Sequence, residues 1–462
     1  MGRLIVVSNR VALPKETRAG GLASALGSAL AERGGLWFGW SGHVAEGDGE
    51  RRLHEHRHGN IDYALVDLTR AEYEHYYLGF ANRTLWPLLH FRPSLLEYKR
   101  ADFEGYLAVN RLFAERIARL ARDDDLIWVH DYHLIPLASE LRKLGVGARI
   151  GFFLHIPLPS SALLTMLPHH EHLFPTFGSY DLIGVQNHRD RDALLQYFRE
   201  EIGARIGAGG DVQLRSGHRL GVHAFPIAID TTEVARQAAR AVRSAATERL
   251  VRSLEHRALA IGVDRLDYSK GLPQRFEAFA HFLSQHPEWR SRISFLQIAP
   301  PTREEVPEYR ELRSRLERLA GATNGRYAEP DWVPIRYVNR SFNQTTLAGF
   351  YRAADIGVVT PLRDGMNLVA KEFVAAQAAE DPGVLILSSF AGAADELRQA
   401  IIINPFDADD IADSIEKALL MPLGERRERW RAMYEYLLRH DIASWRSAFL
   451  DALTGALPRA AA

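Results

Sequence analysis

Short runs of apolar residues alternate with longer amphipathic stretches along most of this 462-residue chain. Uninterrupted apolar runs of four or five residues are typical of parallel strands that are covered on both faces, and strand–helix alternation is typical of βαβ units. The pattern therefore predicts an α/β fold with largely parallel sheets. In the first half of the chain we expect strands at 4–7, 126–129, 150–154 and 182–185.

The alternation restarts after an Arg- and Ala-rich stretch at 231–257, which we interpret as a connector. It predicts two doubly wound, Rossmann-like domains that face each other across a cleft. We expect an N-terminal domain over 1–235, a C-terminal domain over 236–440, and a last helical segment, 441–462, that packs back on the first domain. The strands expected in the second half are 259–263, 293–297, 356–359 and 384–388.

Composition excludes several classes of function. Lys and Arg number 57 against 58 Asp and Glu, so the net charge is −1, without the basic excess of a nucleic-acid binder or a polybasic membrane anchor. The chain has no Cys, which excludes disulfides, Cys-ligated metals and thiol nucleophiles. It shows no signal peptide and no apolar run of about 18 residues, so we expect a cytoplasmic protein without a membrane partner.

Three segments resemble metal sites but are better explained otherwise. Residues 54–58 read H-E-H-R-H, which fits the zinc motif H-E-x-x-H, yet they lie between turn residues and alternate as in an exposed hairpin. The His-rich 169–172 has no defined ligand spacing and is interpreted as a solvated turn. The acidic 123–125 directly precedes a strand and is interpreted as a helix-to-strand turn. We therefore predict no metal.

Two loops that follow strands carry the groups that bind phosphates. Arg10 follows the first strand, and Gly20 and Gly21 then open a helix, whose N-terminal N–H groups favour anions. Arg265 and Lys270 follow the strand at 259–263, at the carboxyl edge where doubly wound sheets bind ligands. Two cations at that edge can neutralise a diphosphate leaving group. A tight turn and an internally paired charged loop are the alternatives.

A third loop, 360–367, again leads from a strand into a helix. The helix would direct the N–H groups of 367–369 at a phosphate, and Glu372 could accept hydrogen bonds from ribose hydroxyls. The alternative is an ordinary helix capped by Asp364 or Asn367.

Aromatic and polar residues follow the strands of the first half. They are Tyr77, Trp86, 130–133 and 155–157. Aromatic rings beside a carboxylate are suited to holding a sugar, although a lone His after a strand is more often a satisfied structural residue.

The chain contains a series of specific segments in one order: S-N-R, A-G-G-L, W-F-G-W-S-G, L-W-P, H-D-Y-H-L, F-F-L-H-I-P, R-L-D-Y-S-K-G and T-P-L-R-D-G-M-N-L-V-A-K-E. In these it resembles the trehalose-6-phosphate synthases, retaining glycosyltransferases of the two-domain GT-B fold, over nearly its whole length. The resemblance implies transfer of glucose from a nucleotide-glucose, UDP-glucose by default with GDP- and ADP-glucose open, to glucose 6-phosphate. It also implies α,α-trehalose 6-phosphate as product, no cofactor, a homo-oligomer (dimer or tetramer), and a separate downstream phosphatase.

The resemblance also implies roles for matching residues. His155 lies where the two glucose rings meet, and Trp86 and Ile156 select the anomer. Arg10, Tyr77, Trp86, Asp131 and Arg303 match the glucose 6-phosphate site, with Arg10 and Arg303 on the phosphate. The catalytic set is Arg265, Lys270, Asp131, His155 and Asp364. The donor site comprises Gly20, Gly21, Arg265, Lys270, Phe342, Asp364, Leu368, Val369, Ala370, Lys371 and Glu372.

Two residues depart from the family's pattern: Ala228 stands where Gly is frequent, and Asp264 where Glu is common. Neither removes a reacting group. No motif supplies a carboxylate nucleophile, so we expect front-face transfer rather than double displacement. A pseudo-glycosyltransferase with a cyclitol substrate and a non-catalytic sugar-phosphate sensor stay as alternatives, while a Rossmann oxidoreductase would need a dinucleotide fingerprint that is missing.

Overall fold

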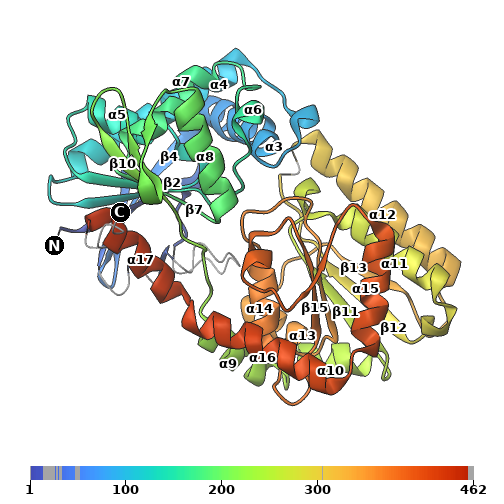
Figure 1. Cartoon of the computed structure of the whole chain (residues 1–462). Coiled ribbons are helices and arrows are strands. Elements are labelled where there is room, and N and C mark those ends of the chain that lie inside the picture. The colour runs from blue at the N-terminus through green and yellow to red at the C-terminus, as the bar shows by residue number, and fades with distance from the viewer. Residues whose placement is uncertain are drawn as a thin grey trace. The chain divides into compact units, whose positions relative to one another are not determined.

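The computed structural model describes residues 2–13, 26–27, 30, 34–46, 53–303 and 305–455. Backbone contacts divide the chain into two compact units, each built on its own sheet (Figure 1). Unit 1 comprises Met1–Ile227 and Ala443–Ala462, and unit 2 comprises Ala228–Ile442. Both are α/β units of the Rossmann-like kind that the alternating pattern predicts.

Unit 1 contains a sheet that, within the described residues, follows the order β3-β4-β2-β1-β5-β6-β7-β10-β9-β8. The strands from β4 to β10 in this order are mutually parallel, whereas β3, β9 and β8 pair in antiparallel fashion. The strand bounds are β1 Leu4–Arg10, β2 Gly35–Ala45, β3 Leu53–His58, β4 Ile61–Thr69, β5 Leu126–His130, β6 Arg149–Phe153, β7 Leu182–Val185, β8 Arg205–Ile206, β9 Asp211–Gln213 and β10 Arg219–Ala224.

Helices cover both faces of this sheet because its central strands β1, β5 and β7 are mostly apolar and almost entirely buried. Trp128 of β5 stacks on Phe449 of α17 with ring centroids 4.7 Å apart, so the last helix covers β5. The helices are α2 Arg70–Glu72, the π-helix η1 Tyr73–Leu85, α3 Trp86–Leu89, α4 Arg100–Leu120, α5 Leu137–Lys143, α6 Ser161–Leu164, α7 His170–Leu173, α8 His188–Glu200 and α17 Ile442–Thr454. The short 3-10 turns are η2 Pro93–Leu95, η3 Tyr132–Leu134, η4 Phe174–Ser179 and η5 Ala208–Gly210.

Unit 2 has a fully parallel sheet with the order β13-β12-β11-β14-β15-β16. The order reverses direction between β11 and β14, the switch point at which doubly wound folds bind ligands. The strands are β11 Ala258–Val263, β12 Ile293–Ile298, β13 Ile335–Val338, β14 Ile356–Val359, β15 Val384–Ser388 and β16 Ile401–Ile403.

One face of the unit 2 sheet packs against α11, α12 and α15, which bury Phe276, Leu316 and Ile411 in a common core (Figure 1). Helices α9, α13, α14 and α16 form a second packed group. The bounds are α9 Thr231–Ala241, α10 Ala245–Arg252, α11 Leu272–Gln285, α12 Pro307–Tyr327, α13 Gln344–Arg352, α14 Leu368–Ala376, α15 Ala408–Leu420 and α16 Leu423–Arg439, with 3-10 turns η6 Tyr268–Lys270, η7 Pro287–Trp289 and η8 Gly392–Asp395.

The eight predicted strands are confirmed in position as β1, β5, β6, β7, β11, β12, β14 and β15, with each end within three residues of the prediction. The predicted hairpin at 54–58 is confirmed as β3, which pairs with β4 and exposes His56 and His58. The segment 231–257 is more ordered than a connector, since it forms α9 and α10. The last helical segment, predicted at 441–462, contains α17, and a further helix, α16, precedes it in unit 2.

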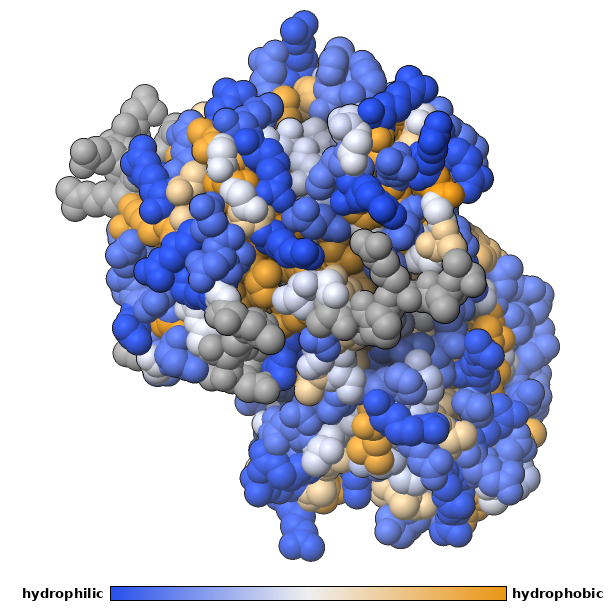
Figure 2. All heavy atoms as spheres, turned by 60° about the vertical axis from the view of Figure 1, so that its left-hand side comes forward, coloured by the Kyte–Doolittle hydropathy of each residue, from blue (hydrophilic) through white to orange (hydrophobic). Residues whose placement is uncertain are grey.

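Among the described residues, no helix is both long enough and apolar enough to cross a lipid bilayer. On the face of the molecule that Figure 2 shows, hydrophilic side chains predominate and hydrophobic ones gather in groups between them.

Candidate functional site

In unit 2, the loops after β11 and β14 lie side by side because these two parallel strands are neighbours. Backbone groups join them: the Leu362 N–H donates to the Ser269 carbonyl at 2.8 Å. Gly271 permits this approach, since it has φ +65° and a Cβ there would lie 2.1 Å from the Thr360 carbonyl oxygen. The result is that Lys270 Nζ reaches Asp364 Oδ2 at 2.5 Å. Two residues predicted to share a site, 94 positions apart, are in contact.

A second charged group surrounds the fully buried Asp267, which follows β11. Arg265 Nη2 lies 3.8 Å and Arg303 Nη1 lies 3.5 Å from Asp267 Oδ2. Arg303 Nη1 also donates to the Tyr309 hydroxyl at 2.6 Å. Arg265 is half exposed whereas Arg303 is nearly buried, so the Arg265 guanidinium is the more accessible cation. Arg303, predicted to bind the acceptor phosphate, therefore lies in unit 2 beside Arg265.

The N-terminus of α14 opens at the same sheet edge. Asn367 has φ +82°, and its Oδ1 accepts a hydrogen bond from the Ala370 N–H at 3.2 Å. Asn367, rather than Asp364, is thus the helix cap, and its Nδ2 donates to Asp364 Oδ2 at 3.1 Å. First-turn N–H groups have no intrahelical acceptor, so those of Leu368 and Val369 are suited to an anion.

The side chains of Lys371 and Glu372 have different surroundings. Lys371 is buried and its Nζ lies 2.6 Å from Glu396 Oε2, so its ammonium belongs to an internal ion pair. A role for Lys371 in donor binding would therefore fall to its backbone. Burial raises the pKa of Glu372 to about 7. A carboxyl group with this pKa changes its charge within the physiological pH range.

Phe342 lies in the loop after β13. Its ring packs edge-on against Phe350 at 5.3 Å between centroids, and the Arg340 guanidinium lies 4.8 Å above it. An aromatic ring held in this way can face a nucleotide base, which fits the place of Phe342 in the donor site that the family resemblance implies.

In unit 1, the predicted polar residues also follow neighbouring strands, β1, β5 and β6. Asp131 has φ +76° and ψ 166°, a backbone conformation that is nearly exclusive to glycine. The conformation is held on both sides: the Asp131 N–H donates to the Phe153 carbonyl at 2.8 Å, and Asp131 Oδ1 accepts from the His155 N–H at 3.2 Å. Strain of this kind clusters at functional sites, where the surrounding structure maintains it.

Aromatic rings connect Arg10 to the residues after β5. The Arg10 guanidinium lies 5.9 Å from the Trp40 ring centroid, Trp40 contacts Tyr77 at 5.7 Å, and Tyr77 stacks on His133 at 5.9 Å. The sequence analysis thus singled out Arg10, Tyr77 and His133 of this series, but not the Trp40 ring between Arg10 and Tyr77.

Trp86 and Ile156, the predicted anomer-selecting pair, are both buried. The Trp86 ring contacts Tyr132 at 5.6 Å and His90 at 4.0 Å between centroids. The structure thus gives Trp86 a fixed position beside the segment that carries Asp131.

Sequence reasoning missed the partner of His155. His130 Nδ1 lies 3.0 Å from His155 Nε2, so one imidazole donates to the other. Burial lowers the pKa of His155 to about 3. The pKa of His130 is also lowered, mainly by burial and to a smaller extent by the neighbouring His155. Both rings are therefore neutral near pH 7. A hydrogen bond between neutral imidazoles fixes a tautomer.

Gly20 and Gly21, which the sequence analysis assigns to the donor site, lie outside the described residues.

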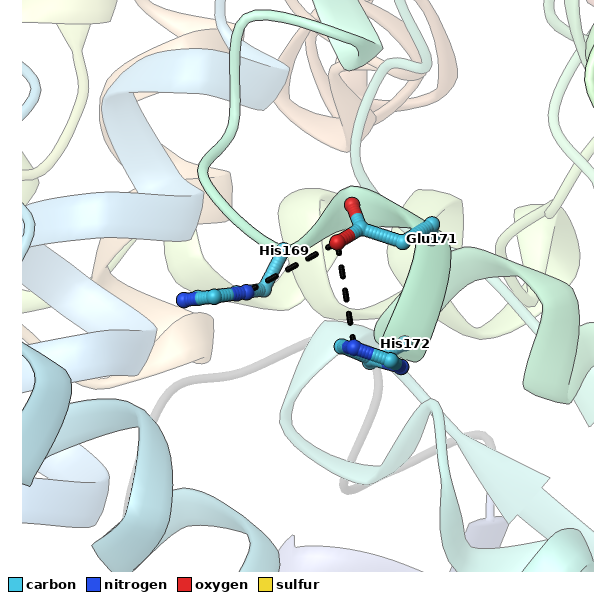
Figure 3. Close-up of side chains that lie close together, drawn as sticks. All are labelled: His169, Glu171 and His172. Atoms are coloured by element: carbon cyan, nitrogen blue, oxygen red, sulfur yellow. Dashed lines mark ion pairs between the residues drawn. The ribbon is translucent and has the colours of Figure 1, made fainter.

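In unit 1, the His-rich segment at α7 brings His169, Glu171 and His172 together (Figure 3). Glu171 Oε1 lies 3.7 Å from His169 Nδ1 and 3.8 Å from His172 Nε2, and all three residues are exposed. We interpret this group as a solvent-exposed cluster of polar side chains, in agreement with the solvated turn predicted for 169–172.

Unit 2 places cations and a helix N-terminus at its switch point, which suits a phosphorylated nucleotide. Unit 1 places the strained Asp131 and aromatic rings at its strand ends, which suits a sugar. Residues 6–455 match the sequence model described as Glycosyltransferase family 20. The chain belongs to glycosyltransferase family 20.

Relatives in glycosyltransferase family 20 match over their full length. Trehalose-6-phosphate synthase of Sinorhizobium fredii is 48% identical over 464 residues, which cover 99% of this chain and 100% of the relative. A solved α,α-trehalose-phosphate synthase (UDP-forming) from Burkholderia xenovorans, in complex with glucose-6-phosphate, is 47% identical with a TM-score of 0.95 and covers 98% of this chain and 100% of its own. An E. coli structure bound with UDP-2-fluoro glucose is 42% identical with a TM-score of 0.93, covering 99% and 100%.

Proposed function

We propose that this chain transfers glucose from UDP-glucose to glucose 6-phosphate and forms α,α-trehalose 6-phosphate and UDP. The observation that carries the proposal is the contact of Lys270 with Asp364 at the switch point of unit 2, beside the N-terminus of α14. It is supported by full-length relatives named as synthases of this product, of which one structure holds glucose-6-phosphate and another a UDP-sugar.

The donor would bind to unit 2. The diphosphate would accept hydrogen bonds from Arg265, Lys270 and the first turn of α14, the ribose hydroxyls would donate to Glu372, and Asp364 would accept from the glucose. As the bond between C1 and the diphosphate oxygen breaks, its electron pair moves to the diphosphate. The fixed positive charges of Arg265 and Lys270 stabilise that developing charge.

The acceptor would bind to the residues predicted for it in unit 1, with Arg10 on its phosphate. Asp131 would accept from its hydroxyls, and Trp86 and Ile156 would contact its apolar face and select the anomer. His155 would lie beside the reacting rings as a neutral imidazole.

We infer the stereochemistry from the carboxylates of the loops after β11 and β14. The three carboxylates there each have a cationic partner: Asp264 pairs with Arg275 at 2.9 Å, Asp364 with Lys270, and Asp267 with Arg303. Retention by double displacement needs a carboxylate that attacks C1. Ion-paired carboxylates are weak nucleophiles, so we propose front-face transfer instead. The acceptor oxygen bonds to C1 on the side from which the diphosphate leaves, and its proton passes to the departing diphosphate oxygen.

The test measures nucleotide release from UDP-, GDP- and ADP-glucose, with and without glucose 6-phosphate. We expect release that depends on the acceptor and is fastest with UDP-glucose. Absence of acceptor-dependent release from every donor would contradict the proposal and favour a sugar-phosphate sensor. Product identification by mass spectrometry separates the synthase from a pseudo-glycosyltransferase, which would leave glucose 6-phosphate unused.

Removal of divalent metals is expected to leave turnover unchanged, because Arg265 and Lys270 supply the charge that a metal ion would otherwise bring to the diphosphate. The measurement compares initial rates after dialysis against EDTA with rates in added Mg²⁺ or Mn²⁺. A large loss of rate that Mg²⁺ restores would overturn this part of the mechanism.

Donor binding is expected to weaken as the pH falls through about 7, because Glu372 then takes up a proton and loses the charge that strengthens its bonds to hydroxyls. The KM for UDP-glucose, measured from pH 5.5 to 8.5 at saturating acceptor, should rise toward low pH. In the Glu372→Gln variant, the KM for UDP-glucose should be higher than the wild-type value at pH 8 and should not change with pH.

The raised pKa of Glu372 also makes the stability of the fold depend on pH. Between its ordinary value of 4.5 and about 7, the folded chain retains a proton that the unfolded chain has released, so the folded state loses stability as the pH rises through this window. Glu372→Gln should remove this loss and melt above the wild type at pH 8. Parallel pH profiles of melting temperature in the two chains would contradict the assignment.

We also propose, from the family resemblance, a cytoplasmic homo-oligomer, either dimer or tetramer, whose product is consumed by a separate phosphatase. Light scattering during size-exclusion chromatography measures the oligomeric state directly.

A further inference from the structure

Arg275 is a buried arginine of α11 whose side chain is 1% exposed. Its guanidinium donates to four acceptors: Nε to Thr360 Oγ1 at 3.0 Å, Nη1 to Gln297 Oε1 at 2.8 Å, and Nη2 to Asp264 Oδ2 at 2.9 Å and to the Lys270 carbonyl at 3.4 Å. A fully buried arginine is costly unless it is paired and hydrogen-bonded, and this one is both.

The four acceptors come from three neighbouring strands. Asp264 and Lys270 follow β11, Gln297 lies near the end of β12, and Thr360 directly follows β14. One guanidinium therefore joins the carboxyl ends of the three strands from which the loops of the proposed donor site begin. Because it bonds the Lys270 carbonyl and the first residue of the loop that carries Asp364, it fixes the two backbones on which the Lys270–Asp364 contact depends.

The surrounding sequence is adapted to this side chain. A Cβ at Gly262 of β11 would lie 2.5 Å from both Arg275 Nη1 and Gln297 Oε1, so only glycine leaves room for their hydrogen bond. Burial raises the pKa of Asp264, while Arg275 and Lys270 act in the opposite direction. Asp264 and Arg275 are both buried and form an ion pair, with Nη2 2.9 Å from Oδ2.

We propose that Arg275 is a positioning residue of the donor-diphosphate site: without touching the donor, it holds Lys270 and the 360–364 loop in the arrangement that binds the diphosphate. The inference rests on the proposed function. A planar guanidinium has five donors in a fixed fork, whereas a lysine ammonium presents three donors from a single point. Lysine at position 275 can preserve the charge beside Asp264 but cannot join three strands.

The experiment compares Arg275→Lys with Arg352→Lys as a matched control. Arg352 is a partly buried arginine of unit 2 that donates to the carbonyls of Ala376 and Gln377, at the other end of α14. Calorimetry with UDP, steady-state kinetics with each substrate, and melting curves are recorded for both variants and for the wild type.

For Arg275→Lys we expect UDP affinity to fall, and the KM for UDP-glucose to rise, by about tenfold or more, because small displacements of a binding site have effects of this size. Arg352→Lys should bind UDP as the wild type does, even where the two variants melt at similar temperatures. Wild-type UDP affinity in Arg275→Lys, with only a lower melting temperature, would overturn the inference and leave Arg275 a purely structural residue.

Thr360→Val keeps the proposal testable if Arg275→Lys does not fold. It removes one of the four acceptors with little change of shape and should weaken UDP binding without unfolding the chain; unchanged UDP affinity there would also count against the inference. Failure of the proposed function is distinguishable, because it would appear in the wild type as UDP binding without acceptor-dependent release.

Discussion

Replacing Arg265 with alanine is expected to lower kcat by about 10²–10³-fold, the loss typical of removing one preorganised donor from a developing negative charge. Arg265 is the accessible cation of the pair around Asp267, so its guanidinium can reach a diphosphate that the buried Arg303 cannot reach as freely. Glucose 6-phosphate binding should survive, because its sugar-binding residues lie in unit 1.

The measurement combines UDP release at saturating substrates with calorimetry of glucose 6-phosphate binding. Arg315→Ala is the matched control: Arg315 is also half exposed and belongs to unit 2, but it pairs with Glu277 on the surfaces of α11 and α12. The control should keep wild-type turnover. Full activity in Arg265→Ala would eliminate the role of Arg265 in stabilising the leaving group.

Much of the fold could be predicted because its strands are short apolar runs between amphipathic helices. The run at 356–359 is apolar throughout, and it becomes the fully buried β14. The positions of the loops after β11 and β14 were predictable for the same reason, since a cation that follows a parallel strand must lie at the ligand-binding edge of the sheet. The contact of Lys270 with Asp364 follows once β11 and β14 are neighbours, a pairing that the sequence pattern does not specify.

The residues that sequence reasoning missed are defined by tertiary contacts. Arg275 is one of many arginines on amphipathic helices, and nothing in its local pattern distinguishes it from solvated ones such as Arg315. Likewise, the left-handed backbone of Asp131 cannot be read from an H-D-Y-H segment, because β6 imposes it through the Phe153 carbonyl and the His155 N–H. The assignment of Lys371 to the donor site failed to anticipate its partner Glu396, which lies beyond β15 in the chain.

Substitutions of Asp131 are expected to separate acceptor binding from stability. Asp131→Asn, Asp131→Gly and Asp131→Ala should each raise the KM for glucose 6-phosphate by about ten- to a hundredfold, the range for losing hydrogen bonds to a charged group. UDP binding should be unchanged, because the proposed donor residues lie in unit 2. Calorimetry with UDP and kinetics in varied acceptor check the two halves of this expectation.

The stabilities of Asp131→Gly and Asp131→Ala should be the reverse of the usual order, in which alanine is more stable than glycine. Alanine is ordinarily more stable than glycine by roughly 0.5–1 kcal/mol, but at φ +76° and ψ 166° a side chain costs about 1–3 kcal/mol that glycine avoids. Both substitutions lose the same bond to the His155 N–H, so the strain decides the difference. Asp131→Gly should therefore melt above Asp131→Ala while both lose acceptor affinity equally. If the alanine variant melted at the higher temperature, the strain would be absent, and the case for Asp131 as a strained binding residue would lose its structural basis.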